Sequence, residues 1–287
     1  MKVATTINDT RSAVAEARRA GKTIGLVPTM GALHRGHFSL IERAARKCDF
    51  IVISIFVNPT QFGPSEDLES YPRTLETDLA GCEARGVDLV FAPGAEEMYP
   101  CKPLTGVAVD LLARTLCGRS RPWHFPGVCA VVAKLFNIVQ PDRAYFGAKD
   151  FQQAAIIKRM AADLNFPVRI VVCPTVREAD GLAMSSRNAY LTPDERGQAA
   201  ALHGALQLAE RTIRGGRPPA AQVVEAIREH IAANAPDGRI DYVQIVDPDE
   251  LRDVENTDGP VLVALAVKFA KARLIDNVLV DAGGDKV

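Results

Sequence analysis

Two histidines in a glycine-containing segment are the residues of this chain best suited to chemistry. His34 and His37 lie in the stretch PTMGALHRGH at 28–37, which follows an apolar run at 24–27 and precedes an amphipathic run at 40–45. The expected layout is strand, loop, helix, which would bring backbone amides and the positive end of a helix to one point. Because such a point binds phosphate, the two imidazoles could hold the phosphates of a nucleotide while a bond forms to its α-phosphorus.

Three other interpretations of this segment compete with nucleotide binding. Gly31 and Gly36 have the spacing of a Walker loop, but His37-Phe38 stands where that loop requires Lys followed by Ser or Thr. A zinc site normally needs a third or fourth ligand, and the sequence contains neither a His-Glu-x-x-His helix nor a Cys-x-x-Cys pair. The histidines could also be ordinary loop residues. Of these, we expect nucleotide binding.

Composition describes an ordinary globular protein. The 287 residues are 47% hydrophobic and 24% charged with a net charge of −1, which gives no reason to expect nucleic acid or an anionic membrane as a partner. The six cysteines have no paired spacing, which is typical of reduced thiols. Neither a signal-peptide core nor a long apolar run is recognised. We therefore expect a soluble, cytoplasmic protein.

Strand-like and helix-like patterns alternate up to about residue 173. The strand-like runs lie at 24–27, 50–57, 88–92, 144–146 and 168–173, and the helical patterns between them lie at 74–85, 128–139 and 150–164. Repeated β-α-β order with short connections predicts an α/β fold with a doubly wound parallel sheet. Ligands of such sheets bind beyond the carboxyl ends of the strands, so the loops at 28–37, 58–66 and 147–150 should open onto one edge.

The pattern changes after Pro174. Thr192 to Glu195 forms a capping box with Pro193 at the first helical position, so a helix should begin there, run toward Arg214 and end at two glycines, 215–216. A second helical pattern at 220–233 and three strand-like runs at 240–246, 261–267 and 274–280 follow. We therefore expect two domains, residues 1–175 and a smaller α+β domain at 176–287.

Three further polar segments could bind ligand. In Gly147-Ala148-Lys149-Asp150, Lys149 can offer a charge to phosphate and Asp150 can accept from ribose hydroxyls. Met184-Ser185-Ser186-Arg187 combines two hydroxyls with a guanidinium, which suits a polyphosphate. The segment 58–63 follows a buried strand, where an amide side chain can bind a small polar substrate. Taken singly, the three segments could equally be a capping turn, a polar loop and a simple turn.

Taken together, the segments around His37 and Arg187 resemble the HIGH and KMSKS pair of class I adenylate-forming enzymes, which implies a Rossmann-like first domain of the nucleotidylyltransferase type. More specifically, the chain resembles the pantoate–β-alanine ligase family. The matching segments are PTMGALHRGH at 28–37, SIFVNPTQFG at 54–63, YPRT at 71–74, HFPGV at 124–128, VAKLFNIVQPDRAYFGAKDFQQ at 132–153 and READGLAMSSRNAYL at 177–191. Beyond about residue 195 only the pattern of helices and strands matches.

This resemblance implies a ligase of pantothenate and coenzyme A biosynthesis. It would join (R)-pantoate to β-alanine, using ATP and Mg²⁺ and giving pantothenate, AMP and pyrophosphate through a pantoyl-adenylate. A carboxylate is already ionised at neutral pH and needs no base to attack the α-phosphorus, so positioning and charge stabilisation should dominate catalysis. The resemblance also implies small-molecule substrates as the partners, a homodimer, and a second domain that closes over the active site.

The resemblance further implies which residues form the site. Those around ATP are Met30, Gly31, Ala32, Leu33, His34, Arg35, Gly36, His37, Gly147, Ala148, Lys149, Asp150, the backbone of Val176, Met184, Ser185, Ser186 and Arg187. The catalytic groups, which would face the phosphates, are His34, His37, Lys149, Ser185, Ser186 and Arg187, with His37 as proton donor to the departing pyrophosphate. Gln61 and Gln153 would hold pantoate, Gln61 would also lie near β-alanine, and Asp78 would be a neighbour of Mg²⁺.

Three positions depart from the family pattern. Ala148 stands where Glu is common, Trp123 stands where Gly is common, and Pro126 replaces a polar residue. None of these changes removes a phosphate or pantoate contact, so we expect activity, with Trp123 and Pro126 stiffening a segment near the substrate entrance.

Two rival functions remain. A nucleotidylyltransferase is disfavoured because the chain has two suitably placed glutamines and no obvious extra basic cluster for a phosphorylated acceptor. A non-catalytic nucleotide-binding protein is disfavoured because both histidines and Lys149 are retained.

Overall fold

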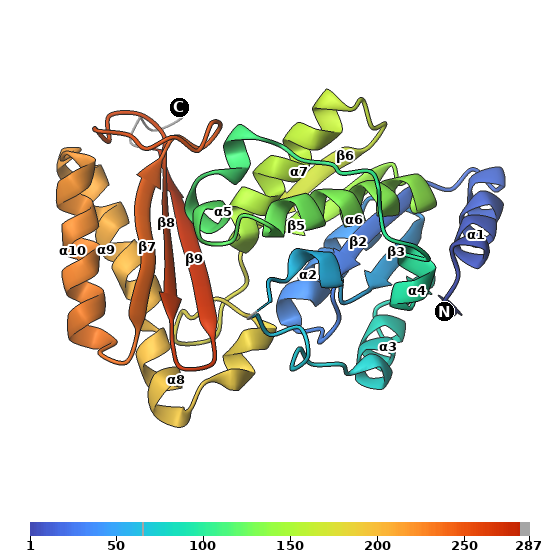
Figure 1. The fold of residues 1–287 in the computed structure, drawn as a ribbon, viewed down its shortest axis with the longest axis horizontal. Coiled ribbons are helices and arrows are strands. Elements are labelled where there is room, and N and C mark those ends of the chain that lie inside the picture. Colours follow the sequence, from blue (N-terminus) through green and yellow to red (C-terminus); the bar gives the residue numbers. More distant parts are fainter. Residues whose placement is uncertain (65, 282–287) are drawn as a thin grey trace. The chain divides into compact units, whose positions relative to one another are not determined.

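The computed structural model describes residues 1–64 and 66–281, which form two compact units (Figure 1). The first unit contains residues 1–110, 121–148 and 153–174. The second contains residues 111–120, 149–152 and the chain from residue 175 onward. Two short segments that precede residue 175 therefore group with the second unit, a division that the sequence pattern did not indicate.

A six-stranded parallel sheet forms the centre of the first unit, with strand order β1-β4-β3-β2-β5-β6. The strands are β1 (Lys2–Ala4), β2 (Ile24–Thr29), β3 (Phe50–Ile55), β4 (Leu89–Phe91), β5 (Arg143–Gly147) and β6 (Arg169–Cys173). The apolar runs of β2, β3 and β4 are buried because helices cover both faces of the sheet. The predicted doubly wound α/β class is confirmed, and β1 is an addition to the predicted strands.

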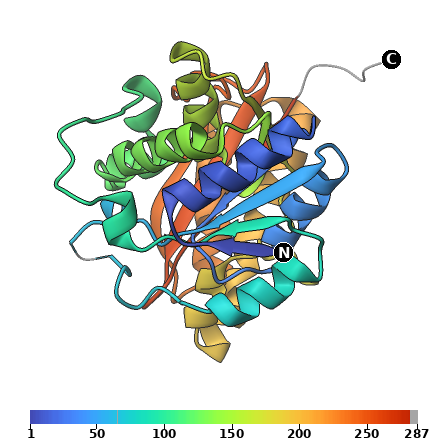
Figure 2. The same cartoon turned by 90° about the vertical axis from the view of Figure 1, so that its right-hand side faces the viewer.

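The helices along this part of the chain are α1 (Ile7–Arg19), α2 (Arg35–Ala45), α3 (Leu75–Glu83), α4 (Ala95–Met98), α6 (His124–Val139) and α7 (Phe151–Asp163). Helices α1 and α6 lie on one face of the sheet, and α2 and α3 lie on the other (Figure 2). Helix α6 begins four residues before the predicted start at 128. The helical pattern predicted at 74–85 is α3, which ends at Glu83, three residues before Gly86 with its φ of +68°.

The order in which the chain adds strands to the sheet reverses between β2 and β5. From β2 the chain proceeds to β3 and then β4 on one side, whereas β5 and β6 lie on the other side. Strands β3, β2 and β5 are parallel neighbours, so the loops that follow Ile55, Thr29 and Gly147 begin at the same edge. Open α/β sheets bind their ligands at such a switch point, which is where the histidine-containing loop begins.

The second unit contains a three-stranded antiparallel sheet, with α9 and α10 packed on one face (Figure 1). Its elements are α5 (Leu116–Ser120), α8 (Pro193–Ala199), α9 (Ala201–Gly216), α10 (Ala220–Asn234), β7 (Arg239–Val246), β8 (Val261–Lys268) and β9 (Arg273–Val280). Every residue of β8 from 261 to 267 is buried, as its uninterrupted apolar run requires. The predicted α+β organisation, two helices followed by three strands, is confirmed.

The predicted helix from 193 to 214 is in fact two helices. The capping box of Thr192 and Glu195 is present, but α8 ends at Ala199 and α9 begins at Ala201. Glu195 also accepts a hydrogen bond from the amide of Ala270 at 2.9 Å, so a contact distant in sequence fixes the direction of α8. Helix α9 ends with Arg217 in the left-handed conformation, at φ +47°, and contains the two glycines expected to end it.

None of the helices that the structure describes combines the length and the apolar character required to cross a membrane.

Candidate active site

The loop that follows β2 is held in shape by a buried carboxylate. Gly31 and Ala32 have φ values of +84° and +49°, so the chain turns sharply before α2. Asp78 on α3 is only 2% exposed, and its two oxygens accept from the amides of Ala32 at 2.9 Å and Leu33 at 2.8 Å. The hydroxyl of Thr74 donates to the same carboxylate at 3.2 Å. Asp78 therefore fixes the loop by satisfying amides that the turn leaves without partners.

These contacts do not fit the expected role of Asp78 as a neighbour of Mg²⁺. Both carboxylate oxygens already accept from backbone amides inside the protein, whereas Mg²⁺ requires accessible oxygen ligands and keeps several waters. Across residues 1–64 and 66–281, no group of three or more His, Cys, Asp or Glu side chains could hold a metal ion. We assign no metal ligand within these described residues.

His34 and His37 form the N-terminal cap of α2. The Nδ1 atom of His34 accepts from the amide of Gly36 at 3.1 Å, and the Nδ1 atom of His37 accepts from the amide of His34 at 3.4 Å. The two rings lie 4.1 Å apart between centroids and 35° from parallel. Because each Nδ1 atom accepts, the proton of each neutral ring is on Nε2. Both rings thus present an Nε2–H donor beside the positive end of a helix, an arrangement suited to phosphate.

Gln61, expected to bind pantoate, contacts Met30 in the loop that follows β2. It ends the short 3-10 helix Pro59–Gln61 after β3 and is 8% exposed. Its Nε2 atom lies 2.9 Å from the sulfur of Met30, and its Oε1 atom accepts from Asn58 at 3.1 Å. Asn58 is 1% exposed and also donates to the carbonyl of Gly127 and accepts from the hydroxyl of Tyr99. Asn58 therefore holds the candidate residue Gln61 in place, a contact that its turn-forming character concealed in the sequence.

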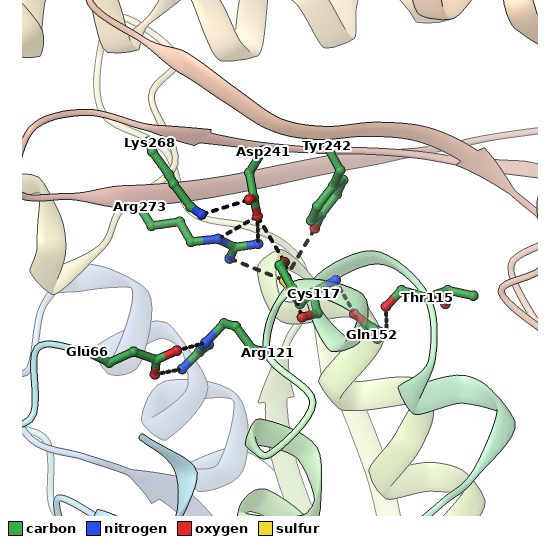
Figure 3. A network of polar contacts seen from close by, with 10 residues as sticks. Glu66, Thr115, Cys117, Arg121, Gln152, Asp241, Tyr242, Lys268 and Arg273 are labelled. Atoms are coloured by element: carbon green, nitrogen blue, oxygen red, sulfur yellow. Dashed lines mark hydrogen bonds and ion pairs between the residues drawn. The ribbon is translucent and has the colours of Figure 1, made fainter. Parts of the chain in front are cut away.

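The backbone of Gln61 is held from the beginning of α6. Its carbonyl lies 3.0 Å from Nδ1 of His124 and accepts from Arg121 at 3.4 Å. Arg121 in turn forms a two-pronged ion pair with Glu66, with distances of 2.7 and 2.5 Å (Figure 3). Burial would raise the pKa of Glu66, but the hydrogen bonds and charge of Arg121 outweigh it and lower the pKa overall. This largely buried pair therefore remains charged at neutral pH.

Two close approaches complete this attachment of the 58–66 segment to α6. The indole of Trp123 lies directly against Gly63, which leaves no room for a side chain there. Gly127 likewise lies against the backbone of Thr60 and Gln61. Trp123, one of the departures from the family pattern, thus packs on the segment that carries Gln61, and the stiffening expected from it stays a prediction.

The remaining candidate phosphate groups lie in the second unit. Met184 donates its amide to the carbonyl of Val176 at 3.0 Å, and Arg177 forms a bridge with Ala183, so the segment preceding Ser185 is a narrow hairpin. The hydroxyl of Ser185 then accepts from the amide of Arg187 at 3.3 Å and caps the 3-10 helix Ser186–Tyr190.

Lys149 and Asp150 lie in the 3-10 helix Ala148–Asp150, where Asn277 of β9 donates to the carbonyl of Lys149 at 2.8 Å. The structure therefore ties the Lys149 segment to β9. Gln153, the second glutamine expected to hold pantoate, lies in the first turn of α7 and is partly buried.

Gln152, next to Gln153, has a structural function that the sequence did not indicate. It is 6% exposed, accepts from the amide of Cys117 at 3.0 Å and donates to the carbonyls of Leu112 and Thr115, both at 2.8 Å (Figure 3). These bonds attach the 111–120 segment to the beginning of α7. No local sequence pattern predicts this contact, because the partners of Gln152 are 35 to 40 residues away along the chain.

A charged network in the same unit joins that segment to the antiparallel sheet. Asp241 accepts from Ser120 at 3.0 Å, pairs with Lys268 at 2.9 Å and pairs with Arg273 at 2.8 Å (Figure 3). Burial would raise the pKa of Asp241, but these partners lower it to about 2. Arg273 also donates to the sulfur of Cys117 at 3.4 Å.

Comparisons with known proteins agree with this architecture. The family model described as Pantoate-beta-alanine ligase matches residues 2–279. A protein named pantothenate synthetase from Moorella thermoacetica is 56% identical over 98% of this chain and 99% of its own length.

Two solved structures are also similar to this chain over nearly its whole length. The pantothenate synthetase of Thermus thermophilus superposes with a TM-score of 0.91 at 47% identity, covering 97% of this chain and 99% of that one. The pantoate-beta-alanine ligase of Francisella tularensis, solved in complex with beta-gamma ATP and beta-alanine, superposes with a TM-score of 0.81 at 34% identity, covering 97% of each chain.

Proposed function

The chain belongs to the pantoate–β-alanine ligase family, and on this basis we propose how its residues carry out that reaction. It catalyses the ATP-dependent condensation of (R)-pantoate with β-alanine to give pantothenate, AMP and pyrophosphate. The observation that best supports this function is the loop of His34 and His37, which caps a helix at the switch point of the sheet and contacts Gln61 through Met30. Membership in this family also removes the nucleotidylyltransferase as a rival.

The reaction proceeds in two displacements. A carboxylate oxygen of pantoate forms a bond to the α-phosphorus of ATP, and the bond from that phosphorus to the bridging oxygen breaks, releasing pyrophosphate. The uncharged amine of β-alanine then attacks the acyl carbon of the pantoyl-adenylate, AMP departs with the electron pair of the broken C–O bond, and the nitrogen loses one proton to solvent. The Nε2–H groups of His34 and His37 donate hydrogen bonds to the phosphate oxygens as charge develops on them. In this tautomer His37 stabilises the departing pyrophosphate as a hydrogen-bond donor and keeps its proton, in place of the proton transfer that the family resemblance implies.

The other candidate side chains form two sets, one that binds the phosphates of ATP and one that binds pantoate. The groups proposed for ATP are residues 30–37, Lys149, Asp150, the Val176 backbone and residues 184–187. The amide side chains of Gln61 and Gln153 each offer one donor group and one acceptor, which suits the hydroxyls and carboxylate of pantoate. In this proposal Gln61 also lies near β-alanine. Mg²⁺ accompanies the nucleotide in this proposal, with no ligand from the chain. We further propose that the protein forms a homodimer and is located in the cytoplasm.

The decisive experiment is the exchange of labelled pyrophosphate into ATP. We expect exchange that depends on pantoate and does not require β-alanine, because the carboxylate can attack ATP before any amine is present. Exchange that requires β-alanine, or that proceeds equally with no acid, would show that the two-step mechanism is wrong for this protein.

A further inference from the structure

Two neighbouring residues of β9 attach two candidate phosphate-binding segments that are far apart in the chain. Asp276 is 3% exposed and accepts two hydrogen bonds from Arg177, at 2.6 and 3.0 Å. Its neighbour Asn277 donates to the carbonyl of Lys149 at 2.8 Å. Because successive side chains of a strand leave opposite faces, this dipeptide can hold one segment on each face of the sheet.

Arg177 connects Asp276 to the hairpin that precedes the serines. The same guanidinium nitrogen that contacts Asp276 also donates to the carbonyl of Gly181 at 3.0 Å, across the hairpin turn. The backbone of Arg177 pairs with Ala183, immediately before Met184. The direction in which residues 184–187 leave the hairpin therefore depends on a guanidinium that a buried carboxylate holds in place.

Strand β9 is a rigid support for these contacts. It pairs with β8 along its whole length, from Arg273 opposite Lys268 to Val280 opposite Val261. Strand β8 is buried from 261 to 267 and pairs with β7 on its other side, so β9 cannot shift without disrupting the core of the second unit. A side chain on such a strand is a fixed reference point for the loops that it contacts.

We infer that Asp276 and Asn277 are positioning residues for nucleotide binding: Asn277 acts through the backbone of Lys149, and Asp276 acts through Arg177 on residues 184–187. In this inference neither Asp276 nor Asn277 contacts ATP itself. The inference rests on the proposed function only in taking Lys149 and residues 184–187 as phosphate-binding groups.

Asn277→Ala tests the first half of the inference by calorimetric titration with ATP alone. Loss of one hydrogen bond that orders the Lys149 segment should weaken ATP binding about fivefold. The matched control is Asn234→Ala, because Asn234 also donates to a backbone carbonyl at 2.8 Å, but does so at the end of α10. The control should leave the ATP affinity unchanged although it removes an equivalent bond.

A double-mutant cycle distinguishes positioning from general destabilisation. If Asn277 acts through Lys149, Asn277→Ala should have almost no effect on ATP binding in a Lys149→Ala background. The inference for Asn277 is wrong if the single variant binds ATP within about twofold of the wild type, or if its effect adds fully to that of Lys149→Ala.

Arg177→Lys tests the second half while keeping the charge beside Asp276. A lysine cannot reach both the carboxylate and the Gly181 carbonyl in the fork geometry of arginine, so ATP binding should weaken about fivefold. Asp276→Asn should weaken it similarly, and Arg177→Lys remains informative if the buried Asp276 variant does not fold. Unchanged ATP affinity in Arg177→Lys overturns this half.

These measurements use ATP without pantoate. A wild-type protein that binds ATP but shows no pantoate-dependent exchange would therefore contradict the proposed function and leave the cycle between Asn277 and Lys149 interpretable.

Discussion

His34 and His37 each use one ring nitrogen for the backbone and present the other as a donor. Their Nδ1 atoms accept the amides at the start of α2, which fixes both the orientation of the rings and the position of the proton on Nε2. Serine, threonine, aspartate and asparagine are the usual residues at helix N-caps, so a histidine there indicates a further function. The same contacts therefore begin the helix and fix the orientation of the two rings that we propose as donors to phosphate.

His37→Ala should reduce pyrophosphate exchange by about 10²- to 10³-fold, because it removes one preorganised donor to developing charge. The fold should remain intact, as judged by circular dichroism, because α2 keeps the cap that His34 provides. His230→Ala is the control, since His230 belongs to α10 and is not among the candidate site residues. Near-normal exchange in His37→Ala would return this histidine to a purely structural role.

Asp78→Asn should destabilise the loop after β2 without any relation to metal. An amide side chain places a donor against one of the two loop amides, which leaves a buried N–H unsatisfied at a cost of about 1–3 kcal/mol in the free energy of unfolding. Urea unfolding and ATP titration should both show the defect, whereas Asp163→Asn, at an exposed carboxylate on α7, should show neither. Recovery of ATP binding in excess Mg²⁺ would instead support a metal role for Asp78.

At the scale of elements, the structure stabilises its ligand-facing loops through residues outside them. Among the described residues 58–64 and 66, one 3-10 turn is the only regular structure, yet this segment is contacted by Arg121, Trp123, His124 and Gly127. These four residues belong to the beginning of α6 or immediately precede it. Because α6 packs on the sheet, the position of Gln61 follows from the position of a helix distant in sequence.

Glu66→Gln should release Arg121 and loosen the segment that carries Gln61. The KM for pantoate should rise about fivefold, while the KM for ATP should change less than twofold, because neither side chain is among the proposed phosphate groups. Trp123 is the only tryptophan and lies against Gly63, so acrylamide quenching of its fluorescence should increase.

Glu210→Gln is the matched control for this variant, since Glu210 pairs with Arg214 on the surface of α9. Equal increases in both KM values, or unchanged quenching, would contradict the role given to the Glu66–Arg121 pair.

At the scale of the whole molecule, each unit has a hydrophobic core of its own. The first core lies between the parallel sheet and helices α2 and α3, and the second lies between the antiparallel sheet and helices α9 and α10. Polar networks supplement these cores where irregular segments must be attached, as Asp241 does for the end of the 111–120 segment.

Asp241 should make stability depend on acidity. Its pKa is about 2 in the folded protein and near 3.8 when unperturbed, so the stabilisation is complete above pH 4 and is lost as the pH falls toward 2. Asp241→Asn should therefore lower the free energy of unfolding at pH 7 by roughly 1–2 kcal/mol and flatten its decrease between pH 4 and pH 2. Urea unfolding across this range, with the exposed Asp253→Asn as control, measures the difference. An unchanged acid slope would contradict this role.

The sequence by itself determined the class of fold, the family and most of the candidate site residues. Apolar runs such as 50–57 and 261–267 predict buried strands because the apolar residues that must be buried are consecutive in the sequence. The Thr192–Glu195 box predicts a helix start because its atoms lie within one turn. The segments at 28–37, 132–153 and 177–191 are specific enough to indicate the family, which the comparisons then showed.

Only the tertiary structure decided how those residues are held. The carboxylate of Asp78 meets amides 45 and 46 residues away, and Asn277 meets a carbonyl 128 residues away. The same is true of Gln152, of the Glu66–Arg121 pair and of the break at Ala200. Local propensity acts over a few residues along the chain, whereas these contacts depend on which distant backbone atoms the fold leaves without partners. The candidate residues for the chemistry can therefore be predicted from the sequence, whereas the residues that hold them in place are identified only in the folded chain.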